Sequence, residues 1–285
     1  MHILLTGSNG FIGSYFVKHY AQKYTIQIFS FLRDNIEDLH LNDIDVVVHL
    51  SALVHQMGGT SADEYKRINV EQSLSLAQKA KISGVKQFVF MSTIKVYGEE
   101  SQIAYDELST CLPQDEYGKS KLRAERELQK LEGENFKVSI IRTPIVYGHG
   151  VKANIKNLIR LVDKIFILPF GSIDNRRTMV YVGNLCAFLD AIIQMQREGI
   201  FLAGDDTSLS TTHLIELIAI AKKKKILLLH GRLVGILLRW LKPSFYKRLF
   251  ESLEVNNTQS KKRLGFVNPY TTQEGIRLMI QSEKP

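Results

Sequence analysis

Cysteine is scarce in this 285-residue sequence, which contains only Cys111 and Cys186. Two cysteines are too few for a disulfide framework, and nothing nearby supplies metal-ligand spacing, so we expect neither a disulfide scaffold nor a metal site. A chain of this length buries roughly 75% of the surface that it exposes when unfolded, and it needs no such cross-link. With 45% hydrophobic and 23% charged residues, the composition is that of a globular protein and excludes a disordered one.

Long apolar runs are also missing. At the N-terminus only the three apolar residues at positions 3–5 precede Thr6 and Gly7, which is too short for a signal peptide or a membrane span. We therefore expect a cytoplasmic protein.

Acidic residues are the minority charge, with 29 Asp and Glu against 37 Lys and Arg, for a net charge of +8. This balance suits an anionic ligand, a nucleic acid or an acidic membrane surface. No basic stretch is interleaved with aromatic residues as a base-stacking surface would be, so nucleic acid is the least favoured partner. The basic run 222–225 precedes an apolar segment, 226–241, that Gly231 and Arg232 interrupt. An anionic membrane fits this segment, but we favour a helix whose apolar side meets the core and whose lysines are solvated.

The first half of the sequence alternates short apolar runs with helical patterns. Near-continuous Val, Ile, Leu and Phe strands between helices indicate a parallel sheet covered on both faces, and therefore an α/β, doubly wound Rossmann fold. The expected strands are 2–6, 25–30, 45–50, 86–91 and 137–142, and the expected helices are 11–22, 62–82 and 116–132. The pattern loosens after about residue 145, and no linker or repeat divides the chain. We expect a dinucleotide-binding domain over 1–150, to which later segments return, and a smaller substrate-binding lobe mainly over 151–285.

A glycine-rich turn, Gly7-Ser8-Asn9-Gly10-Phe11-Ile12-Gly13, lies between the first strand and the first helix. Glycines at this spacing allow a tight turn, close approach of the backbone to a pyrophosphate, and close packing of helix on strand. The helix N-terminus then offers free N–H groups to the phosphates. Because a strand precedes the motif and a helix follows it, the sequence predicts a dinucleotide site.

The end of the second strand bears on which dinucleotide is bound. An acidic residue there would accept the ribose hydroxyls of NAD and repel the extra phosphate of NADP. The strand instead ends near Ser30 without a carboxylate, and Arg33 follows. Ser30 and Arg33 could hold a 2′-phosphate, but Arg33 is equally well a solvated residue beside Asp34. The sequence leaves NAD and NADP open.

Tyr117 and Lys121 are four residues apart in a helical segment and project from one face. An ammonium beside a phenol favours the phenolate and lowers the tyrosine pKa, so that Tyr117 can exchange a proton with a sugar hydroxyl or carbonyl. Ser92 and Thr93, at the end of the fourth strand, add hydroxyls where such sheets bind ligands. By contrast, we expect His49 and His55 to be structural, and the 57–59 loop fits a sugar pocket or a surface turn equally well.

Taken together, these motifs resemble the extended short-chain dehydrogenases/reductases, the family of nucleotide-sugar epimerases, dehydratases and reductases. The resemblance covers nearly the whole chain and specifies the family better than the substrate. The motifs, in family order, are the glycine turn, Asn69 within 65–70, Ser92–Gly98, Tyr117 with Lys121, Arg142–Gly148, Arg177–Leu185 and Lys262–Phe266.

The resemblance implies roles for individual residues. Thr93, Tyr117 and Lys121 would form the catalytic triad, with Tyr117 as acid and base and Lys121 holding the nicotinamide ribose. For the cofactor it implies the glycine-turn residues Gly7, Asn9, Gly10, Phe11, Ile12 and Gly13, the strand-end residues Leu50, Ser51 and Ala52, and Asn69, Ser92, Pro144 and Ile145. For the substrate it implies Arg177 on the nucleotide diphosphate, Asn154 facing the nucleotide, and Arg248 as a weaker second diphosphate contact.

One departure from the family narrows the activity. The 4,6-dehydratases of the family carry Asp-Glu directly after the catalytic Thr, whereas this chain has Ile94 and Lys95, so a dehydratase is disfavoured. Our leading hypothesis is a UDP-hexose 4-epimerase that works through a transient 4-keto sugar and bound NAD. The alternative is an NADPH-dependent 4-reductase of nucleotide-linked 4-keto-6-deoxy sugars, and a non-catalytic dinucleotide sensor is less favoured. The family resemblance also implies a homodimer and a place in polysaccharide biosynthesis.

Overall fold

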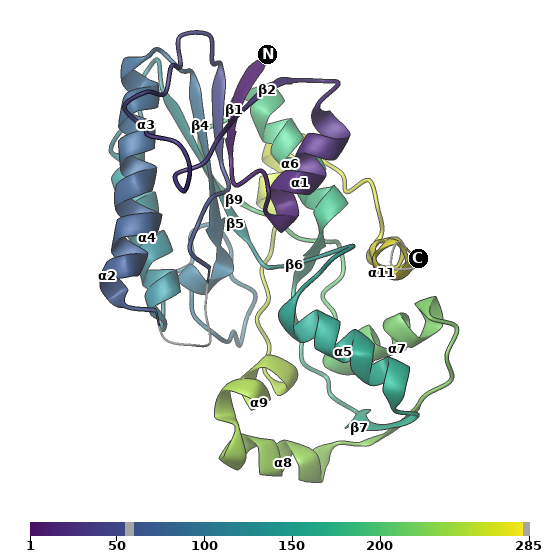
Figure 1. Cartoon of the computed structure of the whole chain (residues 1–285). Helices are drawn as coiled ribbons and strands as arrows, with labels where there is room; N and C mark the ends of the chain where they lie inside the picture. Colours follow the sequence, from purple (N-terminus) through teal and green to yellow (C-terminus); the bar gives the residue numbers. More distant parts are fainter. Residues whose placement is uncertain (55–59, 282–285) are drawn as a thin grey trace.

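The computed structural model describes residues 1–54 and 60–281 (Figure 1). His55 and the 57–59 loop therefore lie outside the described residues. In Figure 1 the chain forms a sheet with helices on both sides and a smaller lobe at the far end from the N-terminus. Among the described residues, no helix has the length and apolar character needed to cross a membrane.

A six-stranded, wholly parallel sheet forms the larger lobe, in the order β2-β1-β3-β4-β5-β9. Every residue of β3 and β4 is buried, as expected for strands covered on both faces. The order reverses direction between β1 and β3, and ligands bind in such sheets at the carboxyl ends beside this point. The predicted doubly wound Rossmann fold is confirmed. The strands are β1 (His2–Thr6), β2 (Thr25–Phe29), β3 (Val46–His49), β4 (Gln87–Thr93), β5 (Lys137–Thr143) and β9 (Gly199–Leu202).

Helices cover the two faces of this sheet (Figure 1). α1 (Phe11–Tyr20) and α6 (Val182–Met195) pack together on one face, and α3 (Gln72–Ile82) and α4 (Glu116–Gln129) on the other. The expected helix over 62–82 is present as α2 (Ala62–Tyr65), the π-helical turn η1 (Lys66–Glu71) and α3.

The smaller lobe begins after β5. It contains two short parallel strand pairs, β6 (Ile145–Tyr147) with β8 (Met179–Tyr181) and β7 (Ile167–Gly171) with β10 (Leu227–His230). Between these segments the chain returns to the larger lobe, because β9 is the edge strand of the main sheet and α6 covers its face. The remaining helices are α5 (Ala153–Lys164), α7 (Thr211–Ala221), α8 (Arg232–Leu241), α9 (Pro243–Phe250), α10 (Thr258–Leu264) and α11 (Thr272–Gln281).

The prediction that the apolar side of segment 226–241 meets the core holds only in part, for Ile226, Leu228 and Leu238, which are partly buried against the core. α8 lies at the end of the small lobe (Figure 1) and leaves Ile236, Leu237, Trp240 and Leu241 exposed. Its inner side, at Gly235, lies against the ring of Phe250. The amphipathic pattern was real, but no other described element lies beyond α8 to cover its apolar face.

Candidate active site

The glycine turn is folded against the end of β3. Gly7 has φ +72°, and a Cβ there would lie 2.9 Å from the backbone of Leu50 and Ser51. A Cβ on Gly13 would lie 2.2 Å from the Gly7 carbonyl oxygen. Helix α1 can therefore pack this closely against the turn only because residue 13 is glycine. No side chain caps the N-terminus of α1, and its first turn has no acidic residue. The turn thus fits a pyrophosphate, and Asn9 is exposed beside it.

A carboxylate lies at the end of β2, although it belongs to Asp34, which follows the strand in the sequence. The Asp34 carboxylate folds back and accepts a 2.8 Å hydrogen bond from the Ser30 N–H, while the Asp34 and Arg33 N–H groups donate to the Ser30 carbonyl. The Arg33 side chain is exposed. A carboxylate at this strand end favours ribose hydroxyls and disfavours a 2′-phosphate.

A buried polar network fixes the ends of β1 and β3. The Thr6 hydroxyl bonds His49 Nδ1 at 2.8 Å and accepts from the Ser51 N–H at 3.1 Å, and His49 Nε2 bonds Ser73 at 2.9 Å. Burial, with the Lys121 charge adding to it, lowers the pKa of His49 to about 3, so the ring is neutral. His49 is structural, as predicted, and it holds the Leu50–Ala52 segment under the glycine turn.

Asn69, in the π-helical turn η1, uses its side-chain amide within the protein. Its oxygen accepts from the Leu53 N–H at 2.8 Å, and its nitrogen donates to the Leu53 carbonyl and to the Ser120 hydroxyl, each at 3.0 Å. The contribution of Asn69 is therefore to clamp the loop after β3 to helix α4, next to Lys121. These bonds give Asn69 a positioning role, and the contact with a cofactor that the family resemblance implies stays a prediction.

Thr93, Tyr117 and Lys121 meet at the carboxyl end of β4. α4 begins after Asp115, whose carboxylate caps the Gly118 N–H at 2.7 Å and so fixes the first turn, which carries Tyr117. The Thr93 hydroxyl lies near Tyr117 and lowers its pKa. Lys121, one turn further on, is fully buried with Nζ 3.8 Å from the centre of the Phe90 ring. The three residues predicted to act together thus lie around the end of one strand.

The expectation that Lys121 lowers the pKa of Tyr117 is wrong for the protein as it stands. Burial raises the pKa of Tyr117 above its usual range, and the Asp115 charge and the neighbouring Tyr65 raise it further. Only the neighbouring Thr93 hydroxyl lowers this pKa. Burial also lowers the pKa of Lys121 itself to about 7. The reason is that burial removes the ammonium from water, where its charge is best solvated.

Beneath the triad lies a buried ion pair that the motifs did not indicate. Arg142 on β5 donates to both Glu125 oxygens at 2.7–3.2 Å and to the Tyr97 hydroxyl at 2.7 Å. The Ser92 hydroxyl also donates to Glu125, so Ser92 faces this pair. Glu125 follows Lys121 by four residues, and that helical spacing was the available signal. Its charge opposes the fall of the Lys121 pKa.

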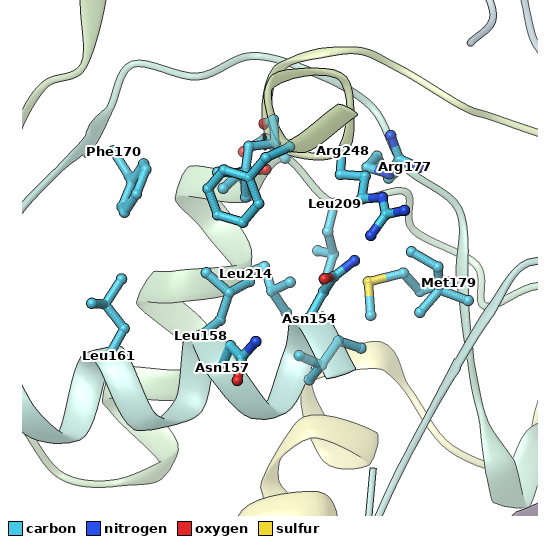
Figure 2. A pocket seen from close by; sticks show the side chains of 16 residues that line it. Asn154, Asn157, Leu158, Leu161, Phe170, Arg177, Met179, Leu209, Leu214 and Arg248 are labelled. Carbon is cyan, nitrogen blue, oxygen red and sulfur yellow. Dashed lines mark hydrogen bonds between the residues drawn. The ribbon is translucent and has the colours of Figure 1, made fainter. Parts of the chain in front are cut away.

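The three residues predicted to bind the substrate line a cavity of about 250 Å³ in the small lobe (Figure 2). Arg177, Arg248 and Asn154 lie at one end of it, and Phe170 and Leu161 at the other. Arg177 is anchored by a 2.9 Å hydrogen bond from its guanidinium to the Glu251 carbonyl. Two guanidinium groups and a carboxamide above an apolar floor suit a nucleotide diphosphate.

The cavity is linked to the triad by the chain that leaves β5. Thr143 pairs with Thr93 across the sheet, Pro144 is buried, and Ile145 lines the cavity. Thr93 is therefore joined through β5 and Pro144 to the wall of the cavity at Ile145. Within the described residues no cluster of His, Cys, Asp and Glu could hold a metal ion.

The chain belongs to the NAD-dependent epimerase/dehydratase family, whose model matches residues 3–204. UDP-glucose 4-epimerase of Vibrio cholerae is 34% identical over 316 residues, which cover 98% of this chain and 94% of the relative. N-acetyl-alpha-D-glucosaminyl-diphospho-ditrans,octacis-undecaprenol 4-epimerase of Escherichia coli O157:H7 is 25% identical, over 99% of this chain and 95% of the relative. In fold alone, the chain matches UDP-glucuronic acid 4-epimerase from Bacillus cereus in complex with NAD, with a TM-score of 0.79, 20% identity and 100% of both chains covered. The predicted family is confirmed, while the roles of single residues stay predictions.

Proposed function

We propose that this protein is a UDP-hexose 4-epimerase that works with bound NAD. The observation that carries the proposal is the proximity of Tyr117 and Thr93 at the end of β4, where β5 pairs beside them and leads into the cavity with Arg177. Family membership and the Vibrio cholerae relative, a UDP-glucose 4-epimerase, support it.

In this proposal the turn from Gly7 to Gly13 holds the NAD pyrophosphate and Asp34 holds the adenosine ribose. Bound NAD+ would accept the hydride from C4 and supply a positive charge, which favours ionisation of a nearby phenol. Tyr117 takes the proton of the 4-hydroxyl, while Thr93 orients that oxygen. Arg177 holds the diphosphate, so the 4-keto sugar can rotate without leaving. The hydride would then return to the opposite face of C4, while Tyr117 returns the proton to the C4 oxygen.

The reductase alternative needs NADPH, and the strand end argues against it. A 2′-phosphate would meet the Asp34 carboxylate, which the Ser30 N–H holds in place. Arg33 is exposed, and a single exposed arginine gives a phosphate little binding energy.

The first test is made on the protein as purified. We expect denaturation to release NAD+, and the protein to interconvert a UDP-hexose and its 4-epimer with no net redox change. Release of no dinucleotide, together with oxidation of NADPH by a UDP-4-keto-6-deoxy sugar, would establish the reductase instead. Bound dinucleotide without turnover of any nucleotide sugar would establish a sensor. Light scattering of the same sample tests the homodimer that the family resemblance implies.

Tyr117→Phe tests the acid/base role. We expect turnover to fall by about 10²–10⁴-fold, with NAD content unchanged, because only the proton-transferring oxygen is lost. Tyr105→Phe is the matched control, since the Tyr105 hydroxyl donates only to the Glu100 carbonyl. Near-normal turnover of Tyr117→Phe would contradict the mechanism.

A further inference from the structure

The positive charge of the molecule is concentrated in one segment. Residues 222–250 contain nine Lys and Arg and no Asp or Glu, which leaves 28 Lys and Arg against 29 Asp and Glu for the rest of the chain. Without this segment the protein would carry a net charge of −1. The segment forms β10, α8 and α9 at the end of the small lobe (Figure 1).

The same segment exposes the apolar side of α8. Trp240 is 83% exposed, Leu241 69%, Leu237 57% and Ile236 55%. On a helical wheel these four residues, here called the α8 face, lie within one arc. A contiguous apolar surface of this kind marks a binding surface in a water-soluble protein. Nothing that the structure describes of the chain covers it.

The lysines of the same segment are only partly neutralised, and one of them, Lys242, directly follows Leu241 of the α8 face. Lys222 and Lys224 share one partner, the Asp163 carboxylate, at 2.9 and 3.4 Å. Lys223, Lys225 and Lys242 make no ion pair with any described residue. The segment therefore combines exposed apolar side chains with lysines that make no ion pair. Helices that lie in a membrane interface have this combination of groups.

The positive charge of the segment also distinguishes the possible binding partners of the α8 face. A second copy of the chain seated on this face would bring two segments of like charge together, and this repulsion opposes such a dimer. A nucleic acid would match the charge but would gain little from Ile236, Leu237 and Leu241. We infer that the α8 face docks onto the surface of an anionic lipid bilayer, with Trp240 at the headgroup level and the lysines on the lipid phosphates.

Docking would set the orientation of the cavity. α9 follows α8 directly, packs against it, and supplies Phe245 and Arg248 to the cavity lining. The arginine end of the cavity would therefore lie close to the bilayer. The docking inference does not depend on the proposed function, because it concerns residues outside the triad.

Trp240 is the only tryptophan of the sequence, so its fluorescence reports on the α8 face directly. We expect vesicles of phosphatidylcholine and phosphatidylglycerol to shift the emission to the blue, brominated lipid to quench it, and the protein to float with these vesicles. Vesicles of phosphatidylcholine alone should bind much more weakly, and high salt should release the protein.

Variants separate the apolar and the charged contributions. Leu237→Glu should abolish flotation, while Leu108→Glu, at a leucine of the other lobe that is even more exposed (95% against 57%), should leave it unchanged. Replacing Lys223 and Lys225 by Gln should weaken binding by roughly 30-fold, about fivefold for each lysine. Epimerase activity on a water-soluble nucleotide sugar should be normal in all of these variants.

Three results would overturn the inference. The first is unchanged Trp240 emission and no flotation with anionic vesicles. The second is a stable dimer that Leu237→Glu dissociates, which would make the face a contact between copies. The third is a response of Trp240 to an oligonucleotide but not to vesicles. If turnover fails while vesicle binding persists, the proposed function falls and the docking stands.

Discussion

Burial of the Lys121 ammonium should make this lysine costly for stability, although the family resemblance assigns it to the nicotinamide ribose. Its pKa falls from 10.5 to about 7 because it is desolvated over the Phe90 ring. Since one pKa unit is worth about 1.4 kcal/mol, the full cost at low pH is at most about 5 kcal/mol. We therefore expect Lys121→Met, an apolar side chain of similar length, to stabilise the dinucleotide-free protein by about 2–4 kcal/mol near neutral pH, and to inactivate it.

The pH dependence gives the sharper test. Between about pH 7 and the ordinary lysine pKa the unfolded chain binds one proton more than the folded chain at this site, so wild-type stability rises with pH over this range. The advantage of Lys121→Met should shrink by about 3 kcal/mol between about pH 7 and 9.5, as urea unfolding of the two proteins would show. Lys119→Met, on the exposed side of the same helix, is the control and should change stability by less than about 0.5 kcal/mol. A destabilised Lys121→Met protein, or an advantage that does not depend on pH, would refute the reasoning.

Two further substitutions test the frame around the site. Glu125→Gln removes the buried partner of Arg142 and should lower the free energy of unfolding by about 3–5 kcal/mol in urea titrations. Glu127→Gln, which removes a surface ion pair, should lower it by less than about 1 kcal/mol. Equal effects of the two substitutions would show that burial of the ion pair does not matter here. Gly13→Ala places a Cβ 2.2 Å from a carbonyl oxygen of the glycine turn and should abolish retention of NAD during purification, while Gly133→Ala, with no atom within 4 Å of its Cβ, should retain it. Normal NAD content in Gly13→Ala would contradict the assigned turn.

Local sequence patterns were enough to predict much of the fold and part of the candidate active site. The spacing of the glycines between a strand and a helix predicted the turn, because it is a property of consecutive residues. The four-residue separation of Tyr117 and Lys121 likewise placed them on one helix face. The pKa of Tyr117 could not be predicted in the same way, because it depends on burial and on neighbours such as Tyr65, a residue of another element.

Two other features depended on contacts that periodicity does not contain. The Asp34 carboxylate reaches the end of β2 only because the chain turns back on itself after Ser30. The amphipathic pattern of α8 predicted a helix with one apolar side, but the pattern is the same whether that side meets the core or lies open. Only the three-dimensional packing of α8 distinguishes these cases.

The repeated return of the chain to the larger lobe has a consequence for how the molecule can be divided. β9 closes the sheet only after the chain has left it, and the Leu202 N–H at the end of β9 donates to the Ser260 hydroxyl of α10 at 2.7 Å. A fragment that stops near residue 150 would lack α6 and β9, and would expose the flank of β5 as an unpaired edge open to aggregation. Neither lobe is therefore expected to be expressed as an independent unit, and the two should melt in one cooperative transition.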